Sequence, residues 1–177
     1  VEACDFIEQD FLVVNGDVAI SQNDIQNLVK KHEQKTPEAS VLATDEQKPE
    51  KFGVLSIEND RVVEIQEKPE KPDNTLVNTG IYIFNPGIFE TLSEMDGDKH
   101  LTDALNSIIE EDIRFELVED YWIDIGSPKK LMKADHVKLG AEAERNISED
   151  AEVHEGAEIL GRVEIREGAE VRPGAVV

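Results

Sequence analysis

Two aspartates stand at places in the sequence where a carboxylate could do chemistry. Asp17 ends an Asn-Gly-Asp segment that directly follows the apolar run 11–14. Asp124 lies between Ile123 and Ile125, so in a strand its side chain points to the face opposite those two residues. A carboxylate in such apolar company needs either a metal ion or backbone N–H donors, and both interpretations stay open. For Asp17, the alternative is a turn former or a helix cap.

A carboxylate and a cation stand side by side at Glu67-Lys68-Pro69. Pro69 cannot pair in a ladder, and it predicts an extended Lys68, so the strand should end there. Both side chains could then reach one pocket, where Glu67 could accept from sugar hydroxyls and Lys68 could pair with a phosphate. The whole stretch 67–72 also has the composition of a solvated polar loop.

Small and amide residues interrupt two apolar segments, at Gly53 and at Asn78-Thr79-Gly80. A glycine inside a strand marks either a close approach of a ligand or a bulge, and the sequence does not decide between them. The four histidines have no metal-ligand spacing, and no Ser-His-Asp arrangement or glycine-rich phosphate loop is present.

The elements that must position these residues alternate between strand-like and helix-like stretches, which is typical of an α/β domain. The apolar run 11–14 predicts a strand buried on both faces of a parallel sheet. A helix should start near residue 24, capped by Ser21 or Asn23. Further strands are expected at 40–44, 52–57, 61–65, 76–84 and 121–125, and further helices from 86, from 101 and from 127 to 139.

The last part of the chain follows a period of six residues. The aliphatic positions of this period are Ile147, Val153, Ile159, Ile165, Val171 and Val177, and the small residues that follow four positions later are Ala151, Ala157, Val163, Ala169 and Ala175. A helix cannot use this period, because six residues rotate its face by about 240°. The pattern indicates a hexapeptide β-helix of fewer than two coils.

Composition limits the possible functions. The 177 residues carry 40 acidic and 18 basic side chains, a net charge of −22, which argues against a nucleic-acid partner. No apolar run approaches the ~20 residues of a membrane span, and one cysteine excludes a disulfide scaffold. We therefore expect a cytoplasmic protein without a membrane partner, in which any phosphate site needs local cations.

Five stretches, taken in order, resemble the sugar-1-phosphate nucleotidyltransferases. They are Phe11-Leu-Val-Val-Asn-Gly-Asp17, Phe52-Gly-Val54, Glu67-Lys-Pro69, Val77-Asn-Thr-Gly-Ile-Tyr-Ile-Phe84 and Trp122-Ile-Asp-Ile-Gly126. Members of this family join a nucleoside triphosphate to a sugar 1-phosphate and release pyrophosphate. Many of them also carry a left-handed β-helix after the catalytic domain.

The resemblance implies an α/β fold in two parts. Residues 1–140 would form the C-terminal part of a Rossmann-like nucleotidyltransferase domain, the half that holds the sugar phosphate and the metal. Residues 141–177 would begin a left-handed parallel β-helix that assembles a homo-oligomer.

The resemblance also implies roles for particular residues. Asp17 and Asp124 would hold Mg²⁺ on the triphosphate, Glu67 would accept from sugar hydroxyls, and Lys68 would pair with the sugar phosphate. Asp17, Lys68 and Asp124 are thus the expected catalytic residues. The expected wall of the sugar pocket is Gly53, Asn78 and Thr79.

One departure from the family pattern affects the expected activity. The glycine-rich loop that cradles the triphosphate does not precede Asp17, so we expect little or no transferase activity from this chain alone. The favoured substrates are glucose 1-phosphate with dTTP or UTP. The alternatives are a bifunctional N-acetylglucosamine-1-phosphate uridylyltransferase with hexapeptide acyltransferase activity, and a non-catalytic regulatory or assembly subunit of the same fold.

Overall fold

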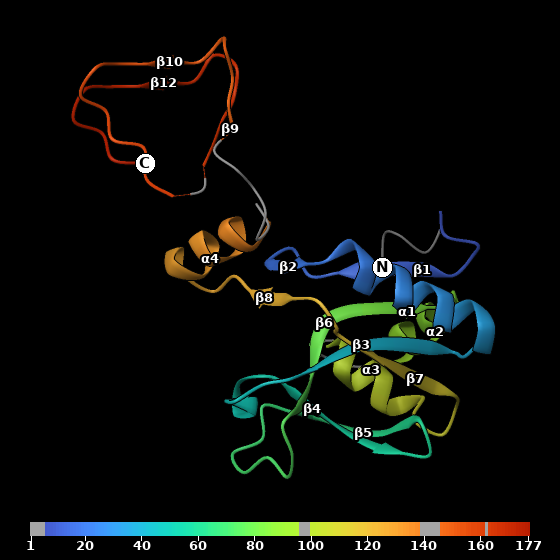
Figure 1. Cartoon of the computed structure of the whole chain (residues 1–177). Helices are drawn as coiled ribbons and strands as arrows, with labels where there is room; N and C mark the ends of the chain where they lie inside the picture. The colour runs from blue at the N-terminus through green and yellow to red at the C-terminus, as the bar shows by residue number, and fades with distance from the viewer. Residues whose placement is uncertain (1–5, 96–99, 139–145, 162) are drawn as a thin grey trace. The chain divides into compact units, whose positions relative to one another are not determined.

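The computed structural model describes residues 6–95, 100–138, 146–161 and 163–177. The chain forms two compact units, Val1–Asp124 and Ile125–Val177, and each is described by itself (Figure 1). The domain boundary predicted between residues 140 and 141 stays a prediction. None of the helices in the described ranges is long and apolar enough to cross a membrane.

The first unit is built on a central sheet with the strand order β5-β4-β6-β3-β7, and β1 also pairs with β6. The strands of this sheet are β1 (Phe11–Val14), β3 (Ala39–Asp45), β4 (Gly53–Glu58), β5 (Arg61–Glu67), β6 (Leu76–Phe84) and β7 (Ile113–Leu117). Two short strands, β2 (Val18–Ile20) and β8 (Trp122–Asp124), pair with each other. The helices are α1 (Gln22–Lys35), α2 (Ile88–Glu94) and α3 (Leu101–Ser107), with a 3₁₀ turn at Pro49–Lys51.

The sheet confirms the predicted α/β class, but its strands run differently from the expectation for β1. Strand β1 is antiparallel to β6, and β3 with β7 is the parallel pair of this sheet in the described ranges. Leu12 and Val14 are each 42% exposed. The prediction of a strand buried on both faces of a parallel sheet is therefore wrong, because a short apolar run does not reveal which neighbours it has.

Strand β6 shares one of its edges between two partners. β1 pairs with its second half, from Ile81 to Phe84, while β4 pairs with Val77 near its start. Residues 78–80 lie between these two pairings. We call this place the β6 fork.

The opposite edge of β6 is irregular at the same position. The β3 register passes from Val41 opposite Tyr82 to Ala43 opposite Asn78, so three residues of β6 face one residue of β3. Gly80 lies in this bulge with φ +77°, a conformation that glycine adopts without strain. The glycine in this strand therefore marks a bulge.

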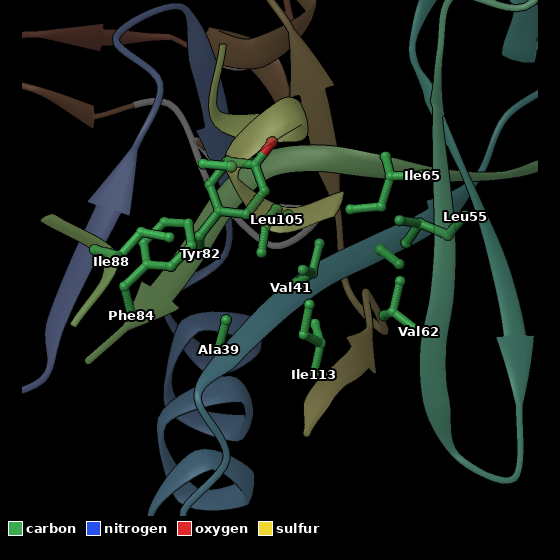
Figure 2. Close-up of a cluster of buried hydrophobic side chains, with 12 residues drawn as sticks. Ala39, Val41, Leu55, Val62, Ile65, Tyr82, Phe84, Ile88, Leu105 and Ile113 are labelled. Carbon is green, nitrogen blue, oxygen red and sulfur yellow. The ribbon is translucent and has the colours of Figure 1, made fainter. Parts of the chain in front are cut away.

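The side chains of the sheet alternate between two apolar clusters. One cluster contains Val41, Tyr82 and Phe84, and Ile88 of α2 and Leu105 of α3 pack into it (Figure 2). The other contains Leu42, Ile81 and Ile83, against which Leu28 of α1 packs. Helix α1 thus covers one face of the sheet, and α2 and α3 cover the other.

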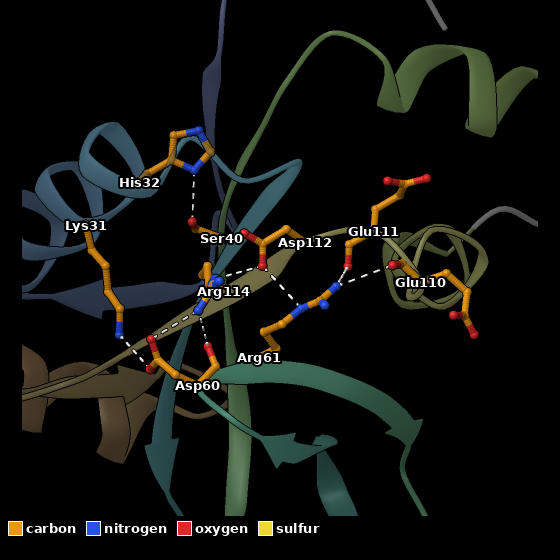
Figure 3. Close-up of polar contacts among 9 residues, drawn as sticks. All are labelled: Lys31, His32, Ser40, Asp60, Arg61, Glu110, Glu111, Asp112 and Arg114. Atoms are coloured by element: carbon orange, nitrogen blue, oxygen red, sulfur yellow. Dashed lines mark hydrogen bonds and ion pairs between the residues drawn. The ribbon is translucent and has the colours of Figure 1, made fainter.

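Helix α1 begins where the sequence predicts. The Ser21 side chain accepts the N–H of Asp24, which makes Ser21 the N-cap of the two candidates. On its buried side His32 Nδ1 lies 2.8 Å from Ser40 Oγ, and Lys31 Nζ lies 3.4 Å from Asp60 (Figure 3).

Two arginines join the β4–β5 turn to the segment that follows α3. Arg114 Nε lies 2.7 Å from Asp112 Oδ1, and Arg114 also pairs with Asp60 in the turn (Figure 3). Arg61 donates to the carbonyls of Glu110 and Glu111. These contacts fix the β4–β5 hairpin to the start of β7 and to the residues just before it.

The second unit contains α4 (Pro128–Lys138) and four short strands. Ser127 precedes α4, as expected from the sequence, and its carbonyl accepts the N–H of Leu131 at 3.0 Å. The predicted end of this helix at Leu139 lies outside the described residues.

The strands of the second unit pair in parallel at a fixed spacing of 18 residues. β9 (Asn146–Ile147) pairs with β11 (Glu164–Ile165), and β10 (Glu152–Val153) pairs with β12 (Glu170–Val171). An isolated bridge joins Glu158 to Val176 at the same spacing. Eighteen residues are three periods of six, so each pairing stacks one hexapeptide on the third one after it.

Candidate functional site

A cavity of about 390 Å³ opens at the β6 fork. It collects residues from β4, β5, β6, β8 and the start of α3, and it is lined by Asn15, Lys51, Phe52, Gly53, Glu67, Lys68, Asn78, Tyr82, His100, Leu101, Thr102 and Asp124. Five of the residues singled out in the sequence are among them. These five are Gly53, Glu67, Lys68, Asn78 and Asp124.

One wall of the cavity is set by a hydrogen bond within β6. The Tyr82 hydroxyl donates to Asn78 Oδ1 at 3.0 Å, so the Asn78 side chain is held by its oxygen. The Asn78 amide nitrogen lies against Gly53, in contact with the position that a Cβ there would occupy. That same position is 3.2 Å from Glu67 Oε2. Gly53 is therefore needed so that Asn78 and Glu67 can converge.

Tyr82 joins the cavity to the apolar core. Its ring stacks on Phe84 with centroids 5.6 Å apart, while its hydroxyl reaches Asn78. Burial raises the pKa of Tyr82 above its ordinary value, and the nearby Glu67 carboxylate raises it further. The hydroxyl consequently keeps its proton, and keeps donating, at alkaline pH where an exposed tyrosine would lose it.

Glu67 and Lys68 both line the cavity, although they are consecutive residues. Lys68 has φ +45°, which is a left-handed conformation, so the prediction of an extended Lys68 before Pro69 is wrong. The Lys68 N–H donates to the Phe52 carbonyl at 3.0 Å, and this bond supports the turned backbone. Lys68 Nζ lies 3.5 Å from Glu67 Oε1. The unusual backbone conformation places a carboxylate and an ammonium group at one cavity.

The β2–β8 pair brings the two predicted aspartates together in the fold. Asp124 is the register partner of Val18, and Asp17 precedes Val18 in the chain. Asp124 is partly buried and lines the cavity, whereas Asp17 is exposed and is not among the lining residues. Two residues that are far apart in sequence thus lie one strand position apart.

Trp122 connects this strand pair to the fork. Its indole N–H donates to the Thr79 carbonyl at 2.9 Å, at the part of β6 that neither β1 nor β4 pairs. Its ring meets that of Phe52 edge to face, with centroids 5.5 Å apart. Trp122 therefore supports the cavity wall through Phe52, although it does not itself line the cavity.

The structure does not bring the Thr79 side chain to the cavity. Thr79 is buried, and its hydroxyl donates to the Leu42 carbonyl of β3 at 2.8 Å. Its predicted place in the sugar pocket is therefore not supported by where its side chain lies.

The described residues do not form a metal site made of protein side chains alone. Among the described residues, no group of three or more His, Cys, Asp or Glu side chains is arranged to hold a metal ion. Mg²⁺ is commonly bound by one or two carboxylates, with waters and substrate phosphates as the other ligands. Asp17 and Asp124 offer two carboxylates, which is the number that Mg²⁺ takes when substrate phosphates supply other ligands, and it is too few for a cage made of protein alone.

Several lining residues were not singled out in the sequence. Tyr82 could have been found, because it stands four positions after Asn78 and therefore shares its strand face. Lys51 could have been found as a cation two residues before Gly53. His100 and Thr102 gave no such signal, because they reach the cavity from a helix that begins more than thirty residues after β5.

A second, larger cavity contains none of the residues expected to do chemistry. It measures about 590 Å³, lies between β1 and α1, and is lined by Gln9, Asp10, Phe11, Leu12, Val29, His32, Glu33 and Ile83. Its size does not make it the better candidate, because it has no lysine or arginine to receive an anion. The convergent polar groups are at the β6 fork.

Comparisons with known proteins agree with this fold. The sequence profile of the family described as Nucleotidyl transferase matches residues 1–139, and the chain belongs to this family. Its relatives include the bifunctional protein GlmU of Methanocaldococcus jannaschii, which is 34% identical over 143 residues. A glucose-1-phosphate thymidylyltransferase of Streptomyces griseus is 29% identical over 166 residues.

These relatives are longer than the chain. The GlmU match covers 77% of this chain and 33% of the relative, and the thymidylyltransferase match covers 89% and 46%. The chain therefore spans less than half the length of these two relatives.

Solved structures show the same fold. A candidate glucose-1-phosphate thymidylyltransferase from Bacillus anthracis, in complex with sucrose, superposes with a TM-score of 0.72 at 27% identity, over 81% of this chain and 61% of that one. A UDP-glucose pyrophosphorylase from Acinetobacter superposes with a TM-score of 0.68 at 22% identity, over 79% of this chain and 55% of that one.

Proposed function

We propose that the cavity at the β6 fork binds a sugar 1-phosphate and presents it to a nucleoside triphosphate. The observation that carries this proposal is the convergence of the Asn78 amide and the Glu67 carboxylate at Gly53, with the Lys68 ammonium group 3.5 Å from that carboxylate in the same cavity. Asn78 and Glu67 offer hydrogen-bonding groups to sugar hydroxyls, and Lys68 offers a charge to the phosphate. The family and its named relatives support this class of substrate.

In this proposal the protein contributes position and charge rather than a proton acceptor. An oxygen of the sugar phosphate attacks the α-phosphorus of the triphosphate, and pyrophosphate leaves on the opposite side. The attacking oxygen is already an anion, so no general base is needed. Asn78 and Glu67 orient the sugar, while Lys68 offsets the charge of its phosphate. Asp17 and Asp124 would hold Mg²⁺, which supplies charge neutralisation on the triphosphate.

Glucose 1-phosphate with dTTP or UTP is the first candidate pair of substrates. It is supported by the thymidylyltransferase relative and by the solved thymidylyltransferase candidate. N-acetylglucosamine 1-phosphate with UTP is the second candidate, because two relatives named GlmU share 34% and 36% identity with the chain. A competition experiment with the two sugar phosphates separates the candidates by their relative affinities.

We also propose that this chain alone has little transferase activity, and that its last part is a left-handed β-helix that assembles a homo-oligomer. The share of the relatives that the chain spans supports the first statement. The parallel pairs at a spacing of 18 residues support the β-helix. Binding of the sugar phosphate is therefore the property to measure on this chain.

Trp122, which is the single tryptophan, gives a direct signal for that binding. We expect glucose 1-phosphate to change its fluorescence in a saturable way, because Trp122 contacts Phe52 in the cavity wall. Lys68→Ala should weaken the binding roughly tenfold or more, as expected for the loss of a hydrogen bond to a charged group.

The chain offers a matched control in the neighbouring Glu70-Lys71-Pro72, which repeats the local sequence. Lys71 does not line the cavity, so Lys71→Ala removes the same charge from the same loop and should leave the affinity near that of the unchanged chain. Equal losses in the two variants would show that only the general charge of the loop matters, and the proposed role of Lys68 would be wrong.

A further inference from the structure

A buried carboxylate outside the cavity has no part in the proposed chemistry. Asp24 stands in the first turn of α1 and is 0% exposed. It does not line the cavity at the β6 fork. A fully buried carboxylate is costly unless it accepts several hydrogen bonds, so its partners show what it does.

The partners of Asp24 belong to the segment that leads into β8. Asp24 Oδ1 accepts the N–H of Glu119 at 2.7 Å, and both of its oxygens lie 3.3 Å from the N–H of Asp120. These two residues are more than ninety positions away in the sequence. A carboxylate that accepts backbone N–H groups forms charge-assisted bonds, which are about twice as strong as neutral ones.

Ser21 completes the connection. Its hydroxyl lies 2.7 Å from Asp24 Oδ2 and 3.0 Å from Asp120 Oδ2, and its N–H donates to the Tyr121 carbonyl at 3.3 Å. The start of α1 therefore holds three consecutive residues, 119–121, by their main chain or side chains. We call this set of contacts, formed by Ser21 and Asp24 with residues 119–121, the α1 latch.

Strand β8 begins directly after the latch. Trp122, its first residue, donates to the Thr79 carbonyl at the fork, and Asp124, its last, lines the cavity. β8 has only three residues, and in the described ranges its strand partner is β2, which is equally short. So few ladder bonds define the position of a strand weakly.

We propose that Asp24 is a positioning residue whose carboxylate fixes the backbone before β8 and thereby places Trp122 at the β6 fork and Asp124 at the cavity. For its effect on ligand binding this inference rests on the proposed function, whereas its effect on Trp122 can be measured without any ligand. Asp24 acts through Asp124 and does not touch the substrate.

The test compares Asp24→Asn with Leu28→Ala in this chain. The asparagine keeps the shape and one accepting oxygen, but its amide nitrogen cannot accept from Ser21 or Asp120. Leu28 is fully buried in the same helix and packs into the cluster that contains Ile81 and Ile83 of β6, so its truncation weakens α1 without removing a latch bond. Ser21→Ala, which removes only the hydroxyl, is a milder variant in case Asp24→Asn does not fold.

Quenching of Trp122 fluorescence by acrylamide, without ligand, is the first measurement. We expect Asp24→Asn and Ser21→Ala to raise the quenching constant under folding conditions, and Leu28→Ala to leave it unchanged. Affinity for glucose 1-phosphate with Mg²⁺ is the second measurement. There we expect a loss of about 10- to 100-fold in Asp24→Asn, as is typical for residues that orient metal ligands.

The two measurements separate the inference from the proposed function. If the unchanged chain binds no sugar phosphate but the latch variants still release Trp122, the proposed function fails and the positioning role stands. If the latch variants quench like the unchanged chain, or if Leu28→Ala quenches as strongly as they do, the positioning role of Asp24 is wrong.

Discussion

Asn78 is the residue on which the geometry of the site depends most. Its oxygen accepts from Tyr82, its nitrogen lies against Gly53, and Glu67 approaches the same point. The orientation of this one amide therefore links the apolar core to the cavity. The strand alternation that places Asn78 and Tyr82 on one face makes this possible.

The Tyr82 hydroxyl should give the folded chain a particular dependence on alkaline pH. Its pKa is raised in the folded state above the ordinary 10.0. Below pH 10 the Tyr82 hydroxyl is protonated in both the folded and the unfolded chain, so it makes the free energy of unfolding no more pH-dependent. Above it the unfolded chain loses a proton that the folded chain keeps, so the free energy of unfolding falls by up to ~1.4 kcal/mol per pH unit.

Tyr82→Phe removes this contribution and tests its origin. We expect the variant to lose about 1 kcal/mol of stability at neutral pH with the hydrogen bond to Asn78, and to show a shallower fall above about pH 10. Urea unfolding followed from neutral to alkaline pH measures both effects. An alkaline slope that is the same in both proteins would show that the raised pKa of Tyr82 is not the cause of the loss of stability.

Lys68 shows where residue-level reasoning from the sequence succeeds and fails. The Glu67-Lys68-Pro69 sequence predicts that the Glu67 and Lys68 side chains can reach one pocket, because the strand has to end before Pro69. In the structure both residues line the same cavity. The left-handed backbone of Lys68 is not predicted by the sequence. A residue before proline prefers an extended conformation, but this is only a tendency, and the hydrogen bond from the Lys68 N–H to the Phe52 carbonyl overrides it here.

At the scale of elements, the site exists because β6 is longer than either strand on its forked edge. β6 has nine residues, and β1 pairs with its last four. Between the pairings with β1 and β4, the Gly80 carbonyl accepts the N–H of Asn15, and the Thr79 carbonyl accepts the indole N–H of Trp122. The cavity opens beside this part of β6.

The bulge at Gly80 should be essential for this arrangement. Gly80 has φ +77°, and a Cβ there would collide with the Asn15 side chain, which itself lines the cavity. We expect Gly80→Ala to lower the free energy of unfolding by about 1–3 kcal/mol and to disturb Asn15. Chemical denaturation measures the loss.

Gly16→Ala is the matched control for this substitution. Gly16 stands one residue after Asn15, and no atom lies within 4 Å of the position of an added Cβ. We expect a change of no more than about 0.5 kcal/mol. A loss as large as that of Gly80→Ala would show that the bulge conformation is not the cause.

The elements themselves were partly predictable. Amphipathic spacing and the Ser21 cap located α1, and the apolar segments 40–44 and 76–84 located β3 and β6, although Asn78-Thr79-Gly80 interrupts the second. β2 and β7 were missed, because β2 has three residues and β7 mixes charged with apolar side chains. The direction of β1 was also missed, since strand pairing depends on contacts that are distant in sequence.

At the scale of the whole molecule, the net negative charge of the chain opposes the binding of a phosphate group at the proposed site. The net charge is −22, so the long-range field repels a phosphate, while Lys51 and Lys68 both line the cavity. The sequence indicated that any phosphate site would need such local cations. It could not show that β2 and β8 would pair and place Asp124 opposite Val18, the residue after Asp17, because two short strands carry almost no periodic signal.

The central claim is that the cavity at the β6 fork binds a sugar 1-phosphate. The most direct measurement is a titration of Trp122 fluorescence with glucose 1-phosphate, in the unchanged chain and in Gly53→Ala. The added methyl group would contact the Asn78 amide and lie 3.2 Å from Glu67, so it would occupy the point where the site converges. We expect saturable binding in the unchanged chain and its loss in Gly53→Ala with the fold retained. No binding in the unchanged chain, or equal affinity in both proteins, would contradict the claim.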